Sequence, residues 1–91
     1  MAGREHTKGW ERFAQELGDN ITRARESRGL SQEKVASAAG LSRHTYQRLE
    51  KGFKSKDEPI NPTLYTILAV CRVLGVHVED ILPSYSGSIF T

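Results

Sequence analysis

The sequence is poor in the features that mark membrane proteins and disulfide-stabilised secreted proteins. It has a single cysteine, Cys71, which excludes an internal disulfide, and none of its apolar runs approaches the roughly 18 residues that a membrane span needs. The amino-terminal residues 1–9 are polar and do not resemble the apolar stretch of a secretory signal. We therefore expect a cytoplasmic protein without a membrane segment.

The sequence also lacks the motifs that support catalysis or metal binding. It contains no HExxH, GxSxG, CxxC or phosphate-loop glycine pattern, and its histidines, His6, His44 and His77, are scattered. Cys71 lies on an apolar stripe, as a small core residue does. Its 91 residues provide for one small domain with a single core. These absences predict a protein that is not an enzyme and has no metal, cofactor or small-molecule ligand.

Charge is distributed unevenly along the chain. The net charge is +2, but residues 1–19, 20–56 and 57–91 carry −1, +6 and −3 respectively. A basic middle segment suits a polyanion such as nucleic acid, and it is equally expected of a solvated charged face. Charge alone leaves both interpretations open.

Apolar spacing and capping residues predict three helices in the first part of the chain. Residues 11–28 place apolar side chains at three- and four-residue steps, Trp10 extends the same face, and Gly29 follows the last turn. Ser31 and Ser42 stand where helix amino-caps are favoured, and Gly40 and Gly52 follow the two short segments that they begin. The second of these segments is a helix over residues 43–51.

The remaining residues predict a loop, two further helices and a tail. Segment 52–62 holds two prolines and no periodicity, which indicates a loop, and no strand alternation is present. A fourth helix follows Asn61 or Thr63 and ends at Gly75, and a fifth covers 78–82 before Pro83. The expected buried stripe of the fourth helix is Leu64, Ile67, Leu68, Cys71 and Leu74.

Residues 31–52, SQEKVASAAGLSRHTYQRLEKG, form a helix-turn-helix pattern of two short helices joined by a glycine-containing turn. With the GLSQ opening, the AG turn, the LEKG end and the LGV link, residues 17–82 resemble the Cro and phage-repressor (XRE) family of DNA-binding proteins. The resemblance implies an all-α, lambda-repressor-like bundle of about five short helices. It divides the chain into an extension over 1–16 that is helical from about residue 10, a DNA-binding domain over 17–82 and a tail over 83–91.

The outer face of helix 43–51 carries the candidate base-reading residues. A helix fits the major groove of B-DNA, where long polar side chains recognise base edges and arginine bonds guanine through two atoms. Tyr46 and Leu49 hold the helix to the core. The candidates are Arg43 and Arg48, followed by His44 and Gln47.

The family resemblance implies further residues that bind the DNA backbone or support the reading helix. Phosphate contacts set register and supply salt-sensitive affinity without base information. The alternatives to phosphate binding are simple helix-start roles for Gln32 and Ser42 and a solvated face for Lys51 and Lys54. An ion pair between Arg25 and Glu50 is expected to fix helix 43–51 against the first helix. The implied phosphate contacts are Gln32, Ser42, Lys51 and Lys54.

The resemblance also implies a homodimer, because a two-fold protein recognises two half-sites about one helical turn apart. Trp10 and Phe13 lie outside the minimal fold, and they serve either the core of the same chain or a second subunit. The expected interface residues are Val76, Val78, Ile81, Leu82, Ile89 and Phe90.

The sequence thus predicts a transcriptional regulator, a repressor or autoregulator, that binds a double-stranded DNA operator. One alternative is a DNA-binding antitoxin or restriction-modification controller, and another is a protein–protein adaptor with the same fold. The operator, the regulated genes and the choice between activation and repression do not follow from the sequence.

Overall fold

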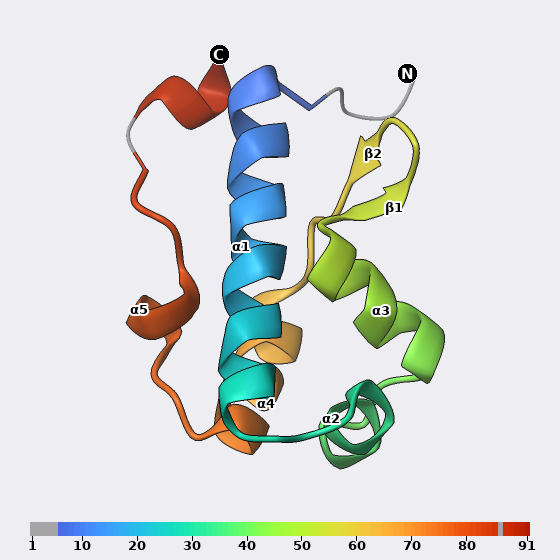
Figure 1. Ribbon diagram of the computed structural model, residues 1–91. Coiled ribbons are helices and arrows are strands. Elements are labelled where there is room, and N and C mark those ends of the chain that lie inside the picture. Colours follow the sequence, from blue (N-terminus) through green and yellow to red (C-terminus); the bar gives the residue numbers. More distant parts are fainter. Residues whose placement is uncertain (1–5, 86) are drawn as a thin grey trace.

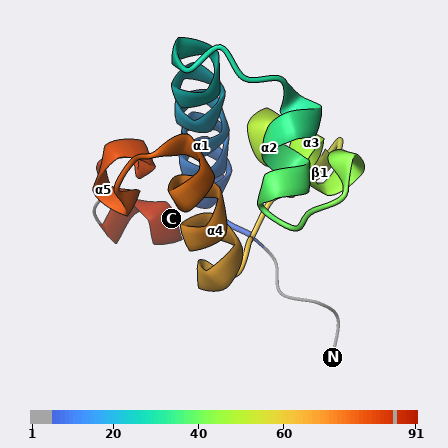
Figure 2. The same ribbon diagram turned by 90° about the horizontal axis from the view of Figure 1, so that it is seen from below.

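The computed structural model describes residues 6–85 and 87–91, and within them a long central helix is surrounded by shorter elements (Figure 1). The hairpin and the α2–α3 pair lie on one side of α1, and α5 lies on the other, an arrangement also visible from below (Figure 2). No helix in these ranges is both long and apolar enough to span a bilayer. The elements are α1 (Lys8–Ser27), α2 (Gln32–Ala38), α3 (Arg43–Lys51), β1 (Phe53–Ser55), β2 (Glu58–Pro59), α4 (Leu64–Leu74), α5 (Val78–Ile81) and the 3-10 helix η1 (Gly87–Phe90). The predicted all-α bundle of about five helices is confirmed, with a small hairpin added.

Side-chain caps begin four of the helices. The hydroxyls of Thr7, Ser31, Ser42 and Thr63 each accept the backbone N–H of the residue three positions later, at 3.0–3.1 Å. Such caps satisfy donors that have no partner within the helix. Because Thr7 caps α1, that helix begins at Lys8, before the expected start near residue 10.

The core lies between α1, α2, α3 and α4 and is closed by α5 and the end of the hairpin. Gly18 allows α1 and α3 to approach closely, because a Cβ there would stand 2.5 Å from the carbonyl oxygen of Glu50. The buried apolar residues are Ala14, Leu17, Ile21, Val35, Ala36, Tyr46, Leu49, Ile60, Ile67, Val70, Cys71, Leu74 and Ile81.

The expectation of a strandless loop over 52–62 is wrong, because β1 and β2 form an antiparallel hairpin there. Phe53 pairs with Pro59 and Ser55 with Glu58, with an irregularity between the two pairs. Strands of three and two residues are too short to show an alternating pattern.

The predicted buried stripe of α4 is wrong at two positions. Leu64 is 69% exposed and Leu68 is 48% exposed, whereas Val70 is completely buried. The helix is rotated so that Ile67, Val70, Cys71 and Leu74 face the core. Tyr65, which is 82% exposed, joins Leu64 and Leu68 on the outer surface.

The segment after Pro83 folds back onto the start of α1. The Thr7 hydroxyl donates to the carbonyl of Ile89, and a Cβ at Gly9 would collide with the carbonyl oxygen of Ser88. The ring of Tyr85 meets Phe13 edge-on, with 6.1 Å between ring centroids. The carboxyl-terminal segment therefore belongs to the packed structure.

Candidate nucleic-acid interface

Helices α2 and α3 form the helix-turn-helix unit. The turn between them uses Gly40 at φ 76°, a left-handed conformation that favours glycine, and the N–H of Leu41 donates to the carbonyl of Ala36 at 2.8 Å. Ser42 then caps α3. Because Tyr46 and Leu49 are buried, the opposite face of α3 points away from the core.

The outer face of α3 is polar and basic. Arg43, His44 and Lys51 are exposed, whereas Gln47 and Arg48 are half-buried. The nine residues of α3 span about 13 Å at 1.5 Å per residue, a length that enters the major groove of B-DNA. The structure thus groups the predicted base-reading residues on one helix face, with Arg48 at its edge.

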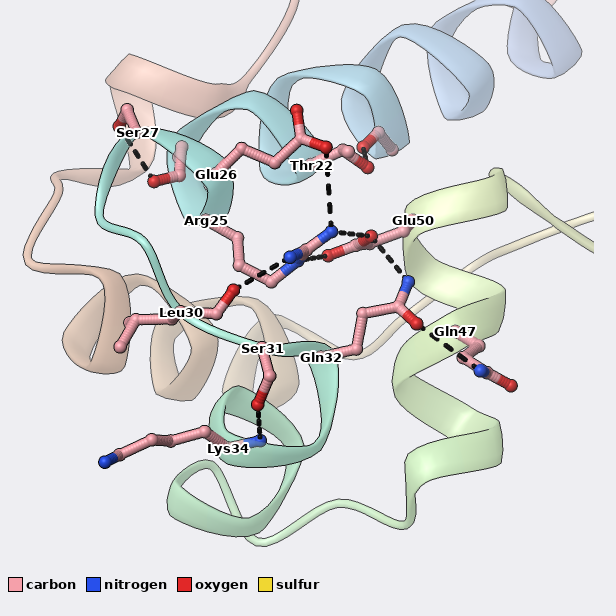
Figure 3. A network of polar contacts seen from close by, with 12 residues as sticks. Thr22, Arg25, Glu26, Ser27, Leu30, Ser31, Gln32, Lys34, Gln47 and Glu50 are labelled. Carbon is pink, nitrogen blue, oxygen red and sulfur yellow. Dashed lines mark hydrogen bonds and ion pairs between the residues drawn. The ribbon is translucent and has the colours of Figure 1, made fainter.

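A bidentate ion pair fixes the inner edge of α3 to α1 (Figure 3). Arg25 donates from Nε to Oε2 of Glu50 at 2.6 Å and from Nη2 to Oε1 at 3.2 Å. The two side chains are 14% and 5% exposed, so most of the pair is shielded from water. Arg25 also donates from Nη1 to the carbonyl of Leu30, at 2.8 Å. The structure therefore brings together the two residues that the family resemblance implies as partners.

The environment of the pair keeps both groups charged. Burial by itself raises the pKa of Glu50, but the hydrogen bonds from Arg25 and Gln32 outweigh it, and the pKa lies below its usual value. The hydrogen bond to Glu50 raises the pKa of Arg25. Burial also raises the pKa of the Tyr46 phenol, so this ring stays neutral beside the pair.

Gln32 connects the ion pair to the outer face of α3. Its Nε2 donates to Oε1 of Glu50 at 2.8 Å, and its Oε1 accepts a longer hydrogen bond from Nε2 of Gln47 at 3.4 Å (Figure 3). Gln47 is the base-reading candidate that Gln32 contacts. Helices α1, α2 and α3 are thus joined by one polar network.

Arg48 lies beside a groove of about 260 Å³ between α3, the hairpin and the start of α4. Its Nε is buried and has no hydrogen-bond partner among the described residues. One wall of the groove is formed by Ile60, Asn61, Pro62 and Thr66. The sequence does not predict this wall, because the hairpin that brings it close to α3 has no recognisable apolar pattern. Arg48 therefore lines this groove, whereas Arg43, His44 and Gln47 do not.

The candidate phosphate-binding residues surround the α3 face but differ in how they are engaged. The Ser42 hydroxyl accepts the Thr45 N–H and donates to the Thr45 hydroxyl, so it has a structural role. Lys51 is exposed, and Lys54 lies on the hairpin with its Nζ 3.6 Å from a carboxylate oxygen of Glu58. The hairpin therefore carries a pairing partner for one of its own lysines.

The expected dimer-interface residues occupy different environments. Ile81 is 1% exposed and belongs to the core of its own chain, so it presents no surface to a second subunit. Val76 and Val78 pack partly against the same core, Ile89 is half-buried, and Leu82 and Phe90 are exposed.

Trp10 and Phe13 contact their own chain. The two rings stack with centroids 5.3 Å apart, and the indole N–H of Trp10 donates to the carbonyl of Ile60 at 3.0 Å. The sequence left open whether these residues serve the core of the same chain or a second subunit. The contacts in the structure are all with the same chain.

Comparisons with known proteins agree with this geometry. A family model described as a helix-turn-helix domain matches residues 16–82. Over 69 residues the chain is 36% identical to y4dJ, an uncharacterized HTH-type transcriptional regulator of Sinorhizobium fredii, covering 75% of this chain and 82% of that protein. The restriction-modification controller protein C.AhdI from Aeromonas hydrophila is similar in structure, with TM-score 0.66, 26% identity, and coverage of 76% of this chain and 96% of that one. A hypothetical transcription factor, NHTF, from Neisseria gives TM-score 0.67 and 25% identity, covering 91% of this chain and 86% of that one.

Proposed function

The chain belongs to the helix-turn-helix family of DNA-binding transcriptional regulators, and we propose that it recognises one duplex sequence by inserting α3 into the major groove. The observation that carries this proposal is the division of α3 into two faces. One face is held by the Arg25–Glu50 pair, and the other presents Arg43, His44 and Gln47. A rigidly seated helix with long polar side chains on its free face suits recognition of base edges.

The proposed roles follow from position on the helix. Arg43, exposed at the start of α3, is the principal base-reading residue, with His44 and Gln47 beside it. Arg48, at the edge of this helix face, recognises a further base. Backbone phosphates are bound by Gln32, Ser42, Lys51 and Lys54.

We propose further that the protein acts as a homodimeric repressor or autoregulator in the cytoplasm, without catalytic activity. Two copies place two reading helices one helical turn of DNA apart, about 34 Å. Exposed large apolar side chains supply the surface for an interface between copies, and three of them share α4. These residues are Leu64, Tyr65 and Leu68 on α4, together with Leu82 and Phe90.

The test is selection of bound sequences from a random duplex pool at near-physiological salt. Wild type is compared with the Arg43→Ala, Arg48→Ala double variant and with Arg12→Ala, which removes an exposed arginine of α1 beside the carboxyl-terminal segment. We expect wild type and Arg12→Ala to enrich the same two-fold motif, with half-sites about 10 base pairs apart, and the double variant to lose or change it. Equal enrichment by all three proteins would refute the assignment of the base-reading residues.

A restriction-modification controller is the second candidate, favoured by the structural similarity to C.AhdI. This role predicts that the enriched motif occurs upstream of the protein's own gene and next to methyltransferase and endonuclease genes. A motif found only at unrelated promoters would favour a general regulator. If no sequence is enriched and only salt-sensitive background binding remains, the adaptor role is the better account.

A further inference from the structure

The indole of Trp10 is bonded to the base of the β-hairpin, fifty positions farther along the chain. Its Nε1–H donates to the carbonyl oxygen of Ile60, the residue directly after β2, at 3.0 Å. The N–H of Ile60 in turn donates to the carbonyl of Gly52, directly before β1, at 2.9 Å. The Trp10 side chain is therefore bonded directly to the segment where the hairpin closes.

The first turns of α1 form a seat for this hairpin base. The Trp10 ring is stacked on Phe13 and also lies near His6, with ring centroids 6.4 Å apart, which restricts the direction in which its N–H points. Gly52, at φ 81°, presses directly on α1, because a Cβ there would lie 2.7 Å from the Cα of Gln15. The start of α1 and the hairpin base thus have a fixed relative position.

The hairpin carries two lysines next to the reading helix, together with the exposed carboxylates of Asp57 and Glu58. Only Gly52 separates it from α3, and its exposed residues include Lys54 and Lys56. Lys54 lines the same groove as Arg48 of α3. The direction of the hairpin relative to α3 therefore decides whether these ammonium groups reach the backbone of a duplex that α3 has entered.

We propose that Trp10 is a positioning residue for DNA binding, whose indole N–H fixes the hairpin so that Lys54 and Lys56 contact phosphates flanking the half-site. This inference rests on the proposed function and extends it to residues 8–15, a segment that precedes the matched helix-turn-helix region. Trp10 itself does not touch DNA and acts through the hairpin.

The test uses Trp10→Phe, which keeps an aromatic ring for stacking and removes the N–H donor. Dissociation constants for the selected duplex are measured across a range of salt concentrations, in the wild-type background and in Lys54→Ala, Lys56→Ala. The matched control is Tyr85→Ala, which removes an exposed aromatic contact at the same end of α1 without touching the hairpin.

Loss of one phosphate contact reduces the slope of log association constant against log salt concentration by about 0.9. It also weakens binding roughly five-fold at about 0.15 M salt. We therefore expect Trp10→Phe to weaken binding by about two- to five-fold with a flatter salt dependence and an unchanged base preference. In the Lys54→Ala, Lys56→Ala background the same substitution should have no further effect, and Tyr85→Ala should match wild type. An unchanged salt dependence, or an equal loss in both backgrounds, would overturn the inference.

Amide hydrogen exchange without DNA provides the second measurement. In Trp10→Phe the Ile60 amide should exchange several-fold faster, while an amide inside α4, such as that of Val70, keeps its rate. Equal acceleration at both amides means that the substitution lowers global stability, and the positioning role is then wrong. If wild type binds no duplex, the DNA role falls with the proposed function, while the Ile60 rate still reports whether Trp10 holds the hairpin.

Discussion

Replacing Glu50 with glutamine removes the negative charge that Arg25 faces while keeping the shape of the side chain. In the native protein Glu50 receives three hydrogen bonds, two from Arg25 and one from Gln32. The amide of the glutamine can accept some of these bonds but leaves the guanidinium without a counter-charge. We expect Glu50→Gln to lower the free energy of unfolding and to loosen α3.

The magnitude follows from the burial of the pair. Removing one partner of a buried ion pair costs roughly 3–5 kcal/mol, and the retained acceptor argues for about 3 kcal/mol here. At about 0.05–0.15 kcal/mol per residue, a domain of this length unfolds at a cost of roughly 5–14 kcal/mol. Because each kcal/mol shifts Tm by about 4–8 °C in a domain of this size, Tm should fall by roughly 12–24 °C.

The assay is thermal unfolding at pH 7, followed by circular dichroism. The control is Glu58→Gln, which breaks the exposed pair with Lys54, whose side chains are about half exposed, and which should change the free energy of unfolding by less than about 1 kcal/mol. The double variant Arg25→Gln, Glu50→Gln removes both charges and should recover part of the loss. A fall in Tm as small as that of Glu58→Gln would show that the pair does not hold α3.

The difference between wild type and Glu50→Gln should also depend on pH. Because the folded-state pKa of Glu50 lies below its unfolded value, the carboxylate contributes its full stabilisation above the unfolded pKa of about 4.3. The contribution decreases as pH falls below that value and is lost once pH passes the folded pKa. The difference in unfolding free energy between the two proteins should therefore be constant from about pH 5.5 to pH 8, a range that lies more than one unit above the unfolded pKa, and should narrow at lower pH.

Three further outcomes follow from packing, burial and capping. Gly18→Ala places a methyl group 2.5 Å from the Glu50 carbonyl oxygen, and it should lower the free energy of unfolding, measured in urea, by about 2 kcal/mol or more. A decrease below about 0.5 kcal/mol, as for an ordinary surface substitution, would show that α1 and α3 separate easily. Cys71 is buried with a raised thiol pKa, so it should react with a disulfide reagent at pH 8 much more slowly in the native protein than in denaturant, and equal rates would contradict its place in the core. Thr63→Ala removes the hydroxyl that accepts the Thr66 N–H and should cost about 1 kcal/mol of stability, whereas Thr63→Ser should retain it.

Capping residues and glycines predicted the middle of the fold well. Ser31, Ser42 and Gly52 mark helix ends through local hydrogen bonds or backbone conformation, which depend on neighbouring residues alone. The start of α1 lies earlier than the apolar spacing predicts, because Thr7 caps the helix and the first turn from Lys8 to Glu11 is mostly polar.

The errors concern features that distant segments decide. In α4 nearly every position from Leu64 to Cys71 is apolar, so two adjacent stripes fit the helical period equally well, and contact with α1, α2 and α5 selects one of them. The hairpin depends on Trp10 and on the close approach of Gly52 to α1, neither of which is visible in a local pattern. In the candidate site, the spacing of α3 showed which residues share a face, whereas the contact between Gln32 and Gln47 required the angle between α2 and α3.

The docking of η1 against the first turn of α1 has a consequence for folding kinetics. The Thr7–Ile89 hydrogen bond joins residues separated by 82 positions, nearly the whole length of the chain. Closing so long a loop costs chain entropy, so this contact should form after the transition state, when the helices have already assembled. Mutations that strengthen the contact between η1 and the first turn of α1 should then slow unfolding and leave the folding rate nearly unchanged. The amino-terminal end of α1 thus governs the lifetime of the native state.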